Sequence, residues 1–320
     1  MPLGEFDVIA RYFTHATTRG DVLLGVGDDA ALLMPPPGQA LVAATDTLVE
    51  GRHFLPGTPA AAIGHQALAV NLSDLAAMGA EPAWALLSLS LPEVDEAWLD
   101  AFAHGLHALA ARHGVALVGG DTVSGPRVVT IEALGFVPPA QALRRGGARP
   151  GDVLFVSGWP GEAAAGLDLL RSGQLPFTAD DRCVRRFLYA EPRLALGHAL
   201  RGRATAAMDV SDGLLGDLAK LARASEAGAT VDLGRLPISP ALAAHADRAR
   251  CERYVLNGGD DYELLFTVPP QLAAQVDVIA AAAGCVVHRI GEVETGSGVR
   301  CVRDGRVESI EETGFDHFAR

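Results

Sequence analysis

The chain alternates between short apolar runs, typical of buried strands, and longer amphipathic stretches, typical of helices. The apolar runs predict strands over residues 41–44, 83–91, 115–118, 127–137, 152–157, 206–208, 231–233, 262–267, 286–293 and 299–302. The longer stretches predict helices over residues 5–17, 59–78, 95–113, 162–170, 181–188, 192–201, 240–250 and 271–283. We therefore expect a mixed α/β fold.

The second predicted helix has clear start and stop signals. Thr58 is a suitable N-cap, Pro59 suits the first helical position, and Gly79 is a fitting stop. Asn71 and Asp74 then lie one turn apart on one face, near the C-terminal end. A carboxylate there opposes the helix dipole, so a bound cation would compensate it. The alternative is an ordinary exposed Asp near a helix end.

A segment rich in proline, glycine and arginine interrupts the pattern at 138–152, with the sequence PPAQALRRGGARPGD. This composition is typical of a linker. We predict an N-terminal domain over 1–137 and a C-terminal domain over 153–320. Arg144 and Arg145 in the linker are either phosphate contacts or solvated charges.

Composition restricts the possible partners. The 320 residues are 49% hydrophobic and 20% charged, which is a globular composition with room for two domains. The formal charge of −13 argues against a nucleic-acid or anionic-membrane surface, because those surfaces need clustered positive charge. The N-terminus does not resemble a signal peptide and no apolar run is long enough to span a bilayer, so we expect a cytoplasmic protein.

The lysine and cysteine content excludes further classes of protein. Lys220 is the single lysine, so neither a P-loop nor a protein-kinase strand lysine is present, and arginine must supply cationic contacts to phosphate. The cysteines lie far apart without C-x-x-C spacing, which indicates neither a zinc knuckle nor a redox pair. They are Cys183, Cys251, Cys285 and Cys301.

Acidic residues follow several of the apolar runs. Asp46 comes just after the predicted strand 41–44, at the carboxyl end where open α/β sheets place ligands. Further acidic motifs are GDDA at 27–30, NLSD at 71–74, GGDT at 119–122 and DVSDG at 209–213. Two carboxylates about 4 Å apart repel by roughly 4 kcal/mol at an effective dielectric near 20, so convergence of these motifs requires cations. Mg²⁺ suits such a site because it accepts carboxylates, waters and phosphate oxygens.

Each motif also has a plainer interpretation. Asp28 and Asp29 could form a solvated turn, and Gly119 and Gly120 a tight turn. The DVSDG motif stands at a strand-to-helix transition, where a helix N-terminus could bind an anion or simply be capped. His53, alone before a loop, is more typical of a structural residue.

Taken together, the motifs GDDAALL, TDTLVEGRHF, AVNLSDLAAMGAEP, GGDT, DVSDGL and GGDDYELLFT resemble the thiamine-monophosphate kinase family. That family lies in the superfamily of aminoimidazole ribonucleotide synthetase, and the likeness covers nearly the whole chain. It implies a two-domain α/β protein whose N-terminal sheet forms a shared barrel in a homodimer. It also implies ATP-dependent phosphorylation of thiamine monophosphate to thiamine diphosphate.

The resemblance also implies roles for individual residues. Ligands of several Mg²⁺ ions would be Asp29, Thr45, Asp46, Asp74, Asp121, Asp209 and Asp212. Contacts to ATP would come from Gly120, Asp121, Arg145 and Ser211. Thiamine would meet His53, Asp260 and Phe315, the last on a C-terminal tail that folds back over the ligand. A monovalent cation is a further candidate cofactor.

Two positions depart from the family pattern. Ala44 stands where the family often has a hydroxyl, and Asp260 stands where it usually has Glu.

The predicted chemistry needs no general base, because a phosphate monoester with a second pKa of about 6 is largely a dianion at neutral pH. The alternatives are another ATP-using superfamily member, such as an enzyme that closes a purine-precursor ring, and a non-catalytic protein that binds divalent metal.

Overall fold

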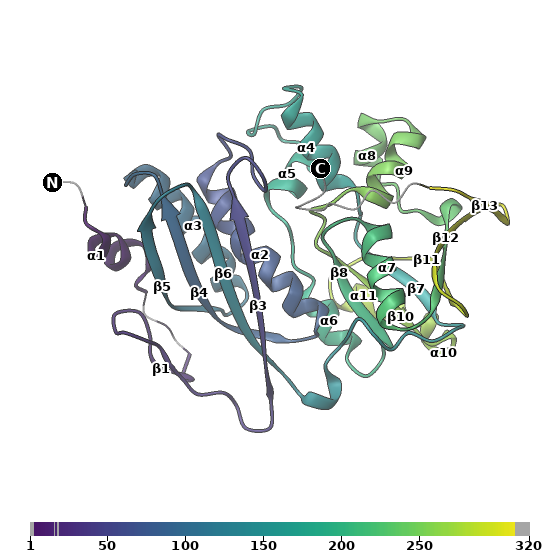
Figure 1. Cartoon of the computed structure of the whole chain (residues 1–320), viewed down its shortest axis with the longest axis horizontal. Helices are drawn as coiled ribbons and strands as arrows, with labels where there is room; N and C mark the ends of the chain where they lie inside the picture. Colours follow the sequence, from purple (N-terminus) through teal and green to yellow (C-terminus); the bar gives the residue numbers. More distant parts are fainter. Residues whose placement is uncertain (1–2, 16, 18, 311–320) are drawn as a thin grey trace. The chain divides into compact units, whose positions relative to one another are not determined.

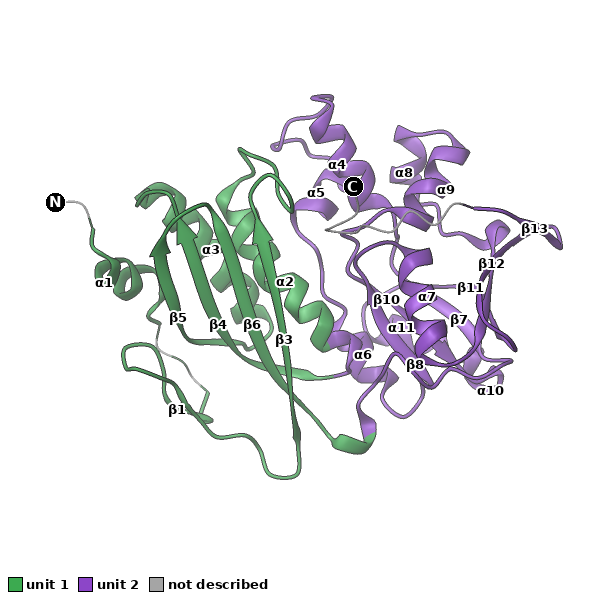
Figure 2. Cartoon of the chain, viewed as in Figure 1, with its two compact units in different colours: residues 1–75, 80–140 green, residues 76–79, 141–320 purple. Residues whose placement is uncertain are grey.

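The computed structural model describes residues 3–15, 17 and 19–310. They form two compact units, coloured green and purple in Figure 2. The first unit comprises Met1–Leu75 and Ala80–Ala140, and the second comprises Ala76–Gly79 and Gln141–Arg320. Both units combine a β-sheet with helices, so the predicted mixed α/β class is confirmed (Figure 1). No helix in the described ranges has the length and apolarity needed to cross a membrane.

The first unit is built on a four-stranded sheet in the order β3-β6-β4-β5. Its strands are β3 (Ala40–Val49), β4 (Glu81–Leu91), β5 (Ala116–Ser124) and β6 (Val128–Val137). Only β4 and β5 pair in parallel; the other neighbours are antiparallel. Its other elements include α1 (Glu5–Val8), a π-helix (Ile9–Phe13), the β1 (Val22–Leu24) and β2 (Leu32–Leu33) pair, α3 (Glu96–Arg112) and α2 (Ala60–Ala77), of which the last two residues belong to the second unit.

Helix α2 packs closely against α3. A Cβ atom at Gly64 would lie 2.1 Å from the carbonyl oxygen of Phe102, and one at Gly105 would lie 1.9 Å from that of Ala61. Glycine at both positions therefore lets the two backbones touch. The predicted helix 59–78 is confirmed, but its predicted cap is not formed, because the buried Thr58 hydroxyl has no hydrogen-bond partner among the described residues.

The first predicted helix is shorter than expected. It ends at Phe13 instead of residue 17, since Thr14 has extended backbone angles. The face of the sheet that carries Trp84 and Phe136 packs partly against Val22 and Leu33 of the β1–β2 pair, which the apolar pattern did not predict.

The predicted strand 41–44 was too short. Strand β3 continues to Val49 because it pairs with β6 along its whole length, from Ala40 opposite Val137 to Val49 opposite Val128. As an edge strand with one face exposed, β3 accommodates polar residues that sequence reasoning placed just beyond the end of the strand. Asp46 therefore lies within an antiparallel strand and not at the carboxyl end of a parallel one.

The second unit contains a seven-stranded sheet in the order β13-β12-β9-β11-β7-β10-β8, in which only β9 and β12 pair in parallel. Its strands are β7 (Val153–Ser157), β8 (Ala206–Val210), β9 (Gly228–Asp232), β10 (Glu263–Val268), β11 (Val287–Glu294), β12 (Gly298–Arg303) and β13 (Arg306–Glu308). Its α-helices are α4 (Glu162–Arg171), α5 (Arg182–Leu188), α6 (Leu194–Leu200), α7 (Leu214–Ala224), α8 (Pro240–His245), α9 (Arg248–Asn257), α10 (Pro270–Ala273) and α11 (Val276–Ala282).

One predicted helix of this unit is divided and extended. The expected helix 240–250 is interrupted at Ala246, whose backbone is extended, and Asp247 caps the new helix α9 by accepting a hydrogen bond from the Arg250 amide. This capping acid was the available signal for the break. The expected helix 271–283 is likewise replaced by the short helices α10 and α11.

Candidate functional site

In the first unit, Asp46 and Asp74 lie on the same side of the sheet. Side chains alternate along β3, and Asp46 shares its face with Val42. Gly135 is opposite Val42, and a Cβ atom there would lie 3.3 Å from the Leu75 side chain of α2. Helix α2, which carries the partly exposed Asp74, therefore packs on the Asp46 face.

Thr45 and Asp121 belong to the opposite face. The Thr45 hydroxyl donates to the Ile131 carbonyl over 3.2 Å. Asp121 is exposed and stands in a row across the sheet with Ser88, Thr130 and Thr47. Since β3 and β5 are three strand spacings apart, Asp46 and Asp121 are separated by roughly 14 Å. The sheet of one chain does not bring these two carboxylates together.

The predicted strand 115–118 continues through the GGDT motif, because residues 119–122 lie inside β5, so the alternative of a tight turn at Gly119 and Gly120 does not hold. Gly120 has a φ of 147°, and a Cβ atom there would lie 1.8 Å from the Leu87 carbonyl oxygen of β4. This glycine thus allows close approach of two strands, which is a structural requirement independent of any contact to phosphate.

The remaining predicted residues of the first unit lie in turns and on α2. Asp29 is exposed, and its amide donates to the Asp28 carboxylate. The Nδ1 atom of His53 accepts a hydrogen bond from the Val49 amide over 3.0 Å, so a neutral His53 carries its proton on Nε2. Asn71 is fully buried and donates to the Ala67 carbonyl, so it belongs to the core.

In the second unit, three predicted residues converge, namely Ser211, Asp212 and Asp260. The DVSDG motif begins inside β8, where the buried Asp209 lies, and continues into a loop that carries Ser211 and Asp212. The amide of Asp260 donates a hydrogen bond to the Ser211 carbonyl over 2.9 Å. Two residues further on, the amide of Tyr262 donates to the Val210 carbonyl over 2.8 Å. Two segments distant in sequence are thereby joined, with Ser211 and the carboxylates of Asp212 and Asp260 at the junction.

Two residues that sequence reasoning missed hold the DVSDG loop. Asp217 is fully buried and accepts hydrogen bonds from the amides of Ser211 and Asp212 at 3.0 and 3.1 Å. Lys220 bridges Asp217 and Asp212 at 2.9 and 2.6 Å. Burial alone would lower the pKa of Lys220, but these two acids outweigh it and raise the pKa. The three-residue spacing of Asp217 and Lys220 on α7 was the only available signal.

Asp260 is held in an unusual conformation beside a pocket. Its φ is 65°, in the left-handed region, and that of Tyr262 is 51°. Burial and the nearby charge of Asp212 raise the pKa of Asp260 to about 6. The pocket has a volume of about 260 Å³ and is lined by Ala164, Leu167, Asp168, Arg253, Tyr254, Asn257, Gly258, Gly259 and Asp260.

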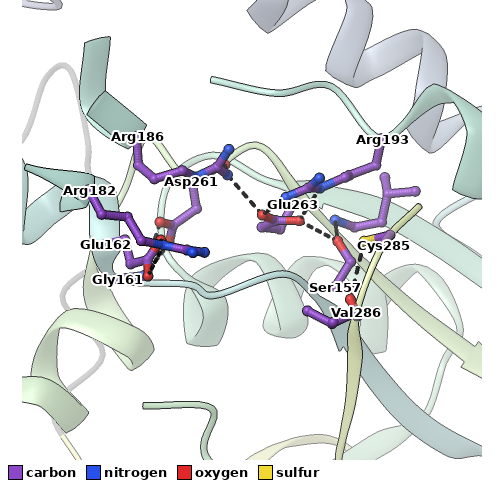
Figure 3. A network of polar contacts seen from close by, with 11 residues as sticks. Ser157, Gly161, Glu162, Arg182, Arg186, Arg193, Asp261, Glu263, Cys285 and Val286 are labelled. Atoms are coloured by element: carbon purple, nitrogen blue, oxygen red, sulfur yellow. Dashed lines mark hydrogen bonds and ion pairs between the residues drawn. The ribbon is translucent and has the colours of Figure 1, made fainter. Parts of the chain in front are cut away.

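A buried polar network holds the strand and loop that carry Asp260 (Figure 3). Glu263 is fully buried and accepts hydrogen bonds from Ser157 at 2.6 Å, Arg186 at 2.8 Å and Arg193 at 2.6 Å. Both carboxylate oxygens of Asp261 accept from the Gly161 amide, at 2.9 and 2.8 Å. Burial alone would raise the pKa of Glu263, but the two arginines outweigh it and hold the pKa below its usual value.

Arg145 occupies an exposed loop of the second unit. The Arg145 carbonyl accepts a hydrogen bond from the Ser225 hydroxyl over 3.2 Å, and the neighbouring Arg144 carbonyl accepts from the Ala207 amide over 2.8 Å. The loop backbone is thus fixed beside β8 and the end of α7, while the Arg145 side chain faces solvent. Phe315 lies outside the described residues.

The predicted acids do not form a compact cluster in the described part of the chain. The one group of three potential ligand atoms within 4.8 Å of one another there comes from Asp181, Cys183 and His245. The predicted oxygen donors are therefore divided among the two faces of the first sheet, an exposed turn at Asp29 and the joined segments of the second unit.

Comparison with known proteins gives matches over both units. Residues 27–137 match the N-terminal domain of AIR synthase related protein, and residues 149–304 match its C-terminal domain. The thiamine-monophosphate kinase of Escherichia coli K12 is 47% identical over 323 residues, covering 100% of this chain and 99% of that protein.

Solved structures give the same relationship. The crystal structure of thiamine-monophosphate kinase from Stenotrophomonas maltophilia K279a is 46% identical, with a TM-score of 0.86 over 91% of this chain and 93% of that one. A structure of AaThiL in complex with AMPPCP and TMP is 32% identical, with a TM-score of 0.79 over 92% of each chain. The chain therefore belongs to the AIR synthase related family and, within it, to the thiamine-monophosphate kinases.

Proposed function

We propose that this protein transfers the γ-phosphoryl group of ATP to the phosphate of thiamine monophosphate, giving ADP and thiamine diphosphate. The observation that carries the proposal is the 47% identity to the Escherichia coli thiamine-monophosphate kinase over the full length of both chains. The AaThiL complex, which holds AMPPCP and TMP, supports the choice of an ATP-like donor and of this acceptor.

The donor set of the site fits Mg²⁺, because it consists of carboxylate and hydroxyl oxygens without thiolate or imidazole. We assign Mg²⁺ binding to Asp29, Thr45, Asp46, Asp74, Asp121, Asp209 and Asp212. Of these, Thr45 has its hydroxyl engaged by Ile131, and Asp212 has Lys220 as its partner at 2.6 Å. When bound, magnesium would neutralise the phosphate oxygens of both substrates.

The protein itself would bind and align the two substrates. We assign ATP contacts to Gly120, Asp121, Arg145 and Ser211, and thiamine contacts to His53, Asp260 and Phe315. A carboxylate at Asp260 suits the positive charge of the thiazolium ring, and the pocket beside it offers about 260 Å³. The phosphate of the acceptor is a dianion at neutral pH, so alignment and charge neutralisation suffice without a general base.

The proposed site includes a second chain. Asp46 and Asp121 of one chain lie on opposite faces of the sheet and roughly 14 Å apart, so a metal cluster that uses both must take Asp121 from a partner. A homodimer whose N-terminal sheets pair into a barrel would supply it, and the exposed Leu41 of β3 and Val123 of β5 give the sheet apolar edges for such pairing.

Cytoplasmic localisation stays a prediction.

The direct test is incubation of the purified protein with Mg-ATP and thiamine monophosphate, followed by chromatography of nucleotides and thiamine species. We expect ADP and thiamine diphosphate in equal amounts. ATP consumption only with a purine precursor would instead favour the ring-closing alternative. Transfer should occur without a phosphoenzyme, and a kinetically competent phosphorylated aspartate would contradict direct transfer.

A further inference from the structure

Outside the proposed reaction site, three side chains of different chemistry meet in the second unit. Asp181 directly precedes α5, Cys183 lies in the first turn of that helix, and His245 ends α8. One carboxylate oxygen, one sulfur and one ring nitrogen from these residues lie within 4.8 Å of one another. The closest described approach is 2.8 Å, between Nε2 of His245 and Oδ2 of Asp181.

We propose that Asp181, Cys183 and His245 form a binding site for a borderline-soft divalent cation such as Zn²⁺. A sulfur, a nitrogen and an oxygen ligand are the set that zinc binds in tetrahedral sites, with a fourth position open to water. A thiolate ligand disfavours Mg²⁺, so this site would differ in selectivity from the oxygen-donor site. None of the three residues belongs to the proposed kinase machinery.

Burial and hydrogen bonding make the three side chains suitable ligands. Cys183 is fully buried, whereas the side chains of Asp181 and His245 are 20% and 25% exposed, so a cation can enter from the solvent side. Oδ1 of Asp181 accepts from the Val184 amide and caps α5, which leaves Oδ2 directed at His245. Asp181 can therefore ligate through Oδ2 without losing its cap.

Zinc binding would require only a small movement of the three ligand atoms. Zinc lies about 2.3 Å from sulfur and about 2.0–2.2 Å from nitrogen and oxygen, so its ligand atoms are roughly 3.5 Å apart. The three atoms here already lie within 4.8 Å. The neighbouring acid Glu162 has its own partner, since both its oxygens accept from Arg182 at 2.8 and 2.9 Å. Without metal, burial and the charge of Asp181 raise the pKa of Cys183 to about 12, so a bound cation must displace the thiol proton.

Such a site would connect α5 to α8. Helix α5 also carries Arg186, which donates to the buried carboxylate of Glu263. A cation on Cys183 and His245 would therefore stabilise the helix that supports the loop of Asp260. We expect its main effect on stability and not on the chemical step.

The experiment is cobalt titration of the metal-free full-length protein in excess Mg²⁺, which occupies oxygen-only sites. We expect one Co²⁺ per chain, with a near-ultraviolet thiolate-to-cobalt absorption band that Zn²⁺ abolishes, and a zinc-dependent rise in melting temperature. Cys183→Ser should lose the band, whereas Cys301→Ser, a matched buried cysteine on β12, should keep it.

A second variant covers the case in which Cys183→Ser does not fold. His245→Gln changes a partly exposed side chain and should weaken cobalt binding by at least about tenfold. The proposal is overturned if the wild type shows no thiolate band, if the band persists in Cys183→Ser, or if His245→Gln binds cobalt as tightly as the wild type. Any of these results would leave Asp181–His245 a plain ion pair beside a core cysteine.

Discussion

Asp260 has a backbone conformation and a charge state that both depend on its surroundings. Its φ of 65° is tolerated by Asp and Asn better than by most residues. The raised pKa of about 6 means that the carboxyl is neutral in mild acid and charged above neutrality. A contact to the permanently cationic thiazolium ring should therefore strengthen as the pH rises.

We predict that the affinity for thiamine, which lacks the titrating phosphate of the substrate, rises between about pH 5 and 7 in the wild type. In Asp260→Asn, thiamine binding should be independent of pH in this range and weaker by about tenfold at pH 7.5, the loss of one charged contact. Calorimetric titration measures both. Asp304→Asn, at another left-handed position, should bind as the wild type does; a pH response retained in Asp260→Asn would remove Asp260 from the thiamine contact.

At the scale of elements, the close pairing of β4 with β5 depends on a single glycine. Gly120→Ala should place a methyl group against the Leu87 carbonyl in a strained backbone, so we predict a loss of roughly 3 kcal/mol or more in the free energy of unfolding. Gly119→Ala is the control, because its new methyl group would meet only the flexible Leu86 side chain at 3.0 Å. Urea denaturation compares the two variants. Equal stabilities would contradict the assigned close approach.

The network around Glu263 gives a second prediction at this scale. Glu263→Gln should lower the free energy of unfolding by about 3–5 kcal/mol, because it leaves Arg186 and Arg193 without their buried carboxylate. The folded pKa lies below the usual 4.5, so the wild type gains this stability above about pH 4.5 and loses it as the pH falls further. Denaturation at pH 7 and pH 4 should show a smaller difference between the two proteins in acid.

Glu294→Gln is the control for that experiment. Glu294 is partly exposed and pairs with Arg300, which is more than half exposed. Removing the Glu294 charge should therefore lower the free energy of unfolding by less than about 1 kcal/mol. If Glu263→Gln were no more destabilising than Glu294→Gln, the network would not hold the Asp260 loop as inferred.

Local sequence signals predicted the elements that are stabilised locally. Apolar periodicity located α2 and α3, with Pro59 and Gly79 bounding α2, and continuous apolar runs located β4 and β6. The predicted strands ended too early, at Ala44 in β3 and at Val118 in β5, because pairing with distant strands determines where both end. Chain-distant partners also explain the missed site residues: no local pattern connects Glu263 to Arg186 and Arg193.

At the scale of the whole molecule, the arrangement of acids decides which predicted ligands can act together. Asp212 and Asp260 lie close together, because hydrogen bonds join the segments of the second unit that carry them. Asp46 and Asp74 share one side of the first sheet, but Asp121 lies on the other. Sequence motifs identify which residues are chemically suitable, whereas face and strand order determine which of them can meet.

This geometry predicts complementation between two inactive variants. Asp46→Asn and Asp121→Asn should each abolish turnover while remaining folded. If Asp121 acts on the site of its partner, a mixed dimer has one site with both defects and one fully intact site. Equimolar mixing with free exchange makes about half of the dimers mixed, so thiamine diphosphate formation should recover to about a quarter of the wild-type rate.

Asp46→Asn mixed with Asp74→Asn is the matched control. These two residues lie on the same side of one sheet, so every mixed dimer should have one defect in each site and remain inactive. Recovery in the first mixture but not the second assigns Asp121 to the partner's site and makes the dimer the catalytic unit. If neither mixture recovers although native mass spectrometry detects mixed dimers, Asp121 does not complete a partner's site. In that case, either Asp46 or Asp121 is not a ligand of the metal.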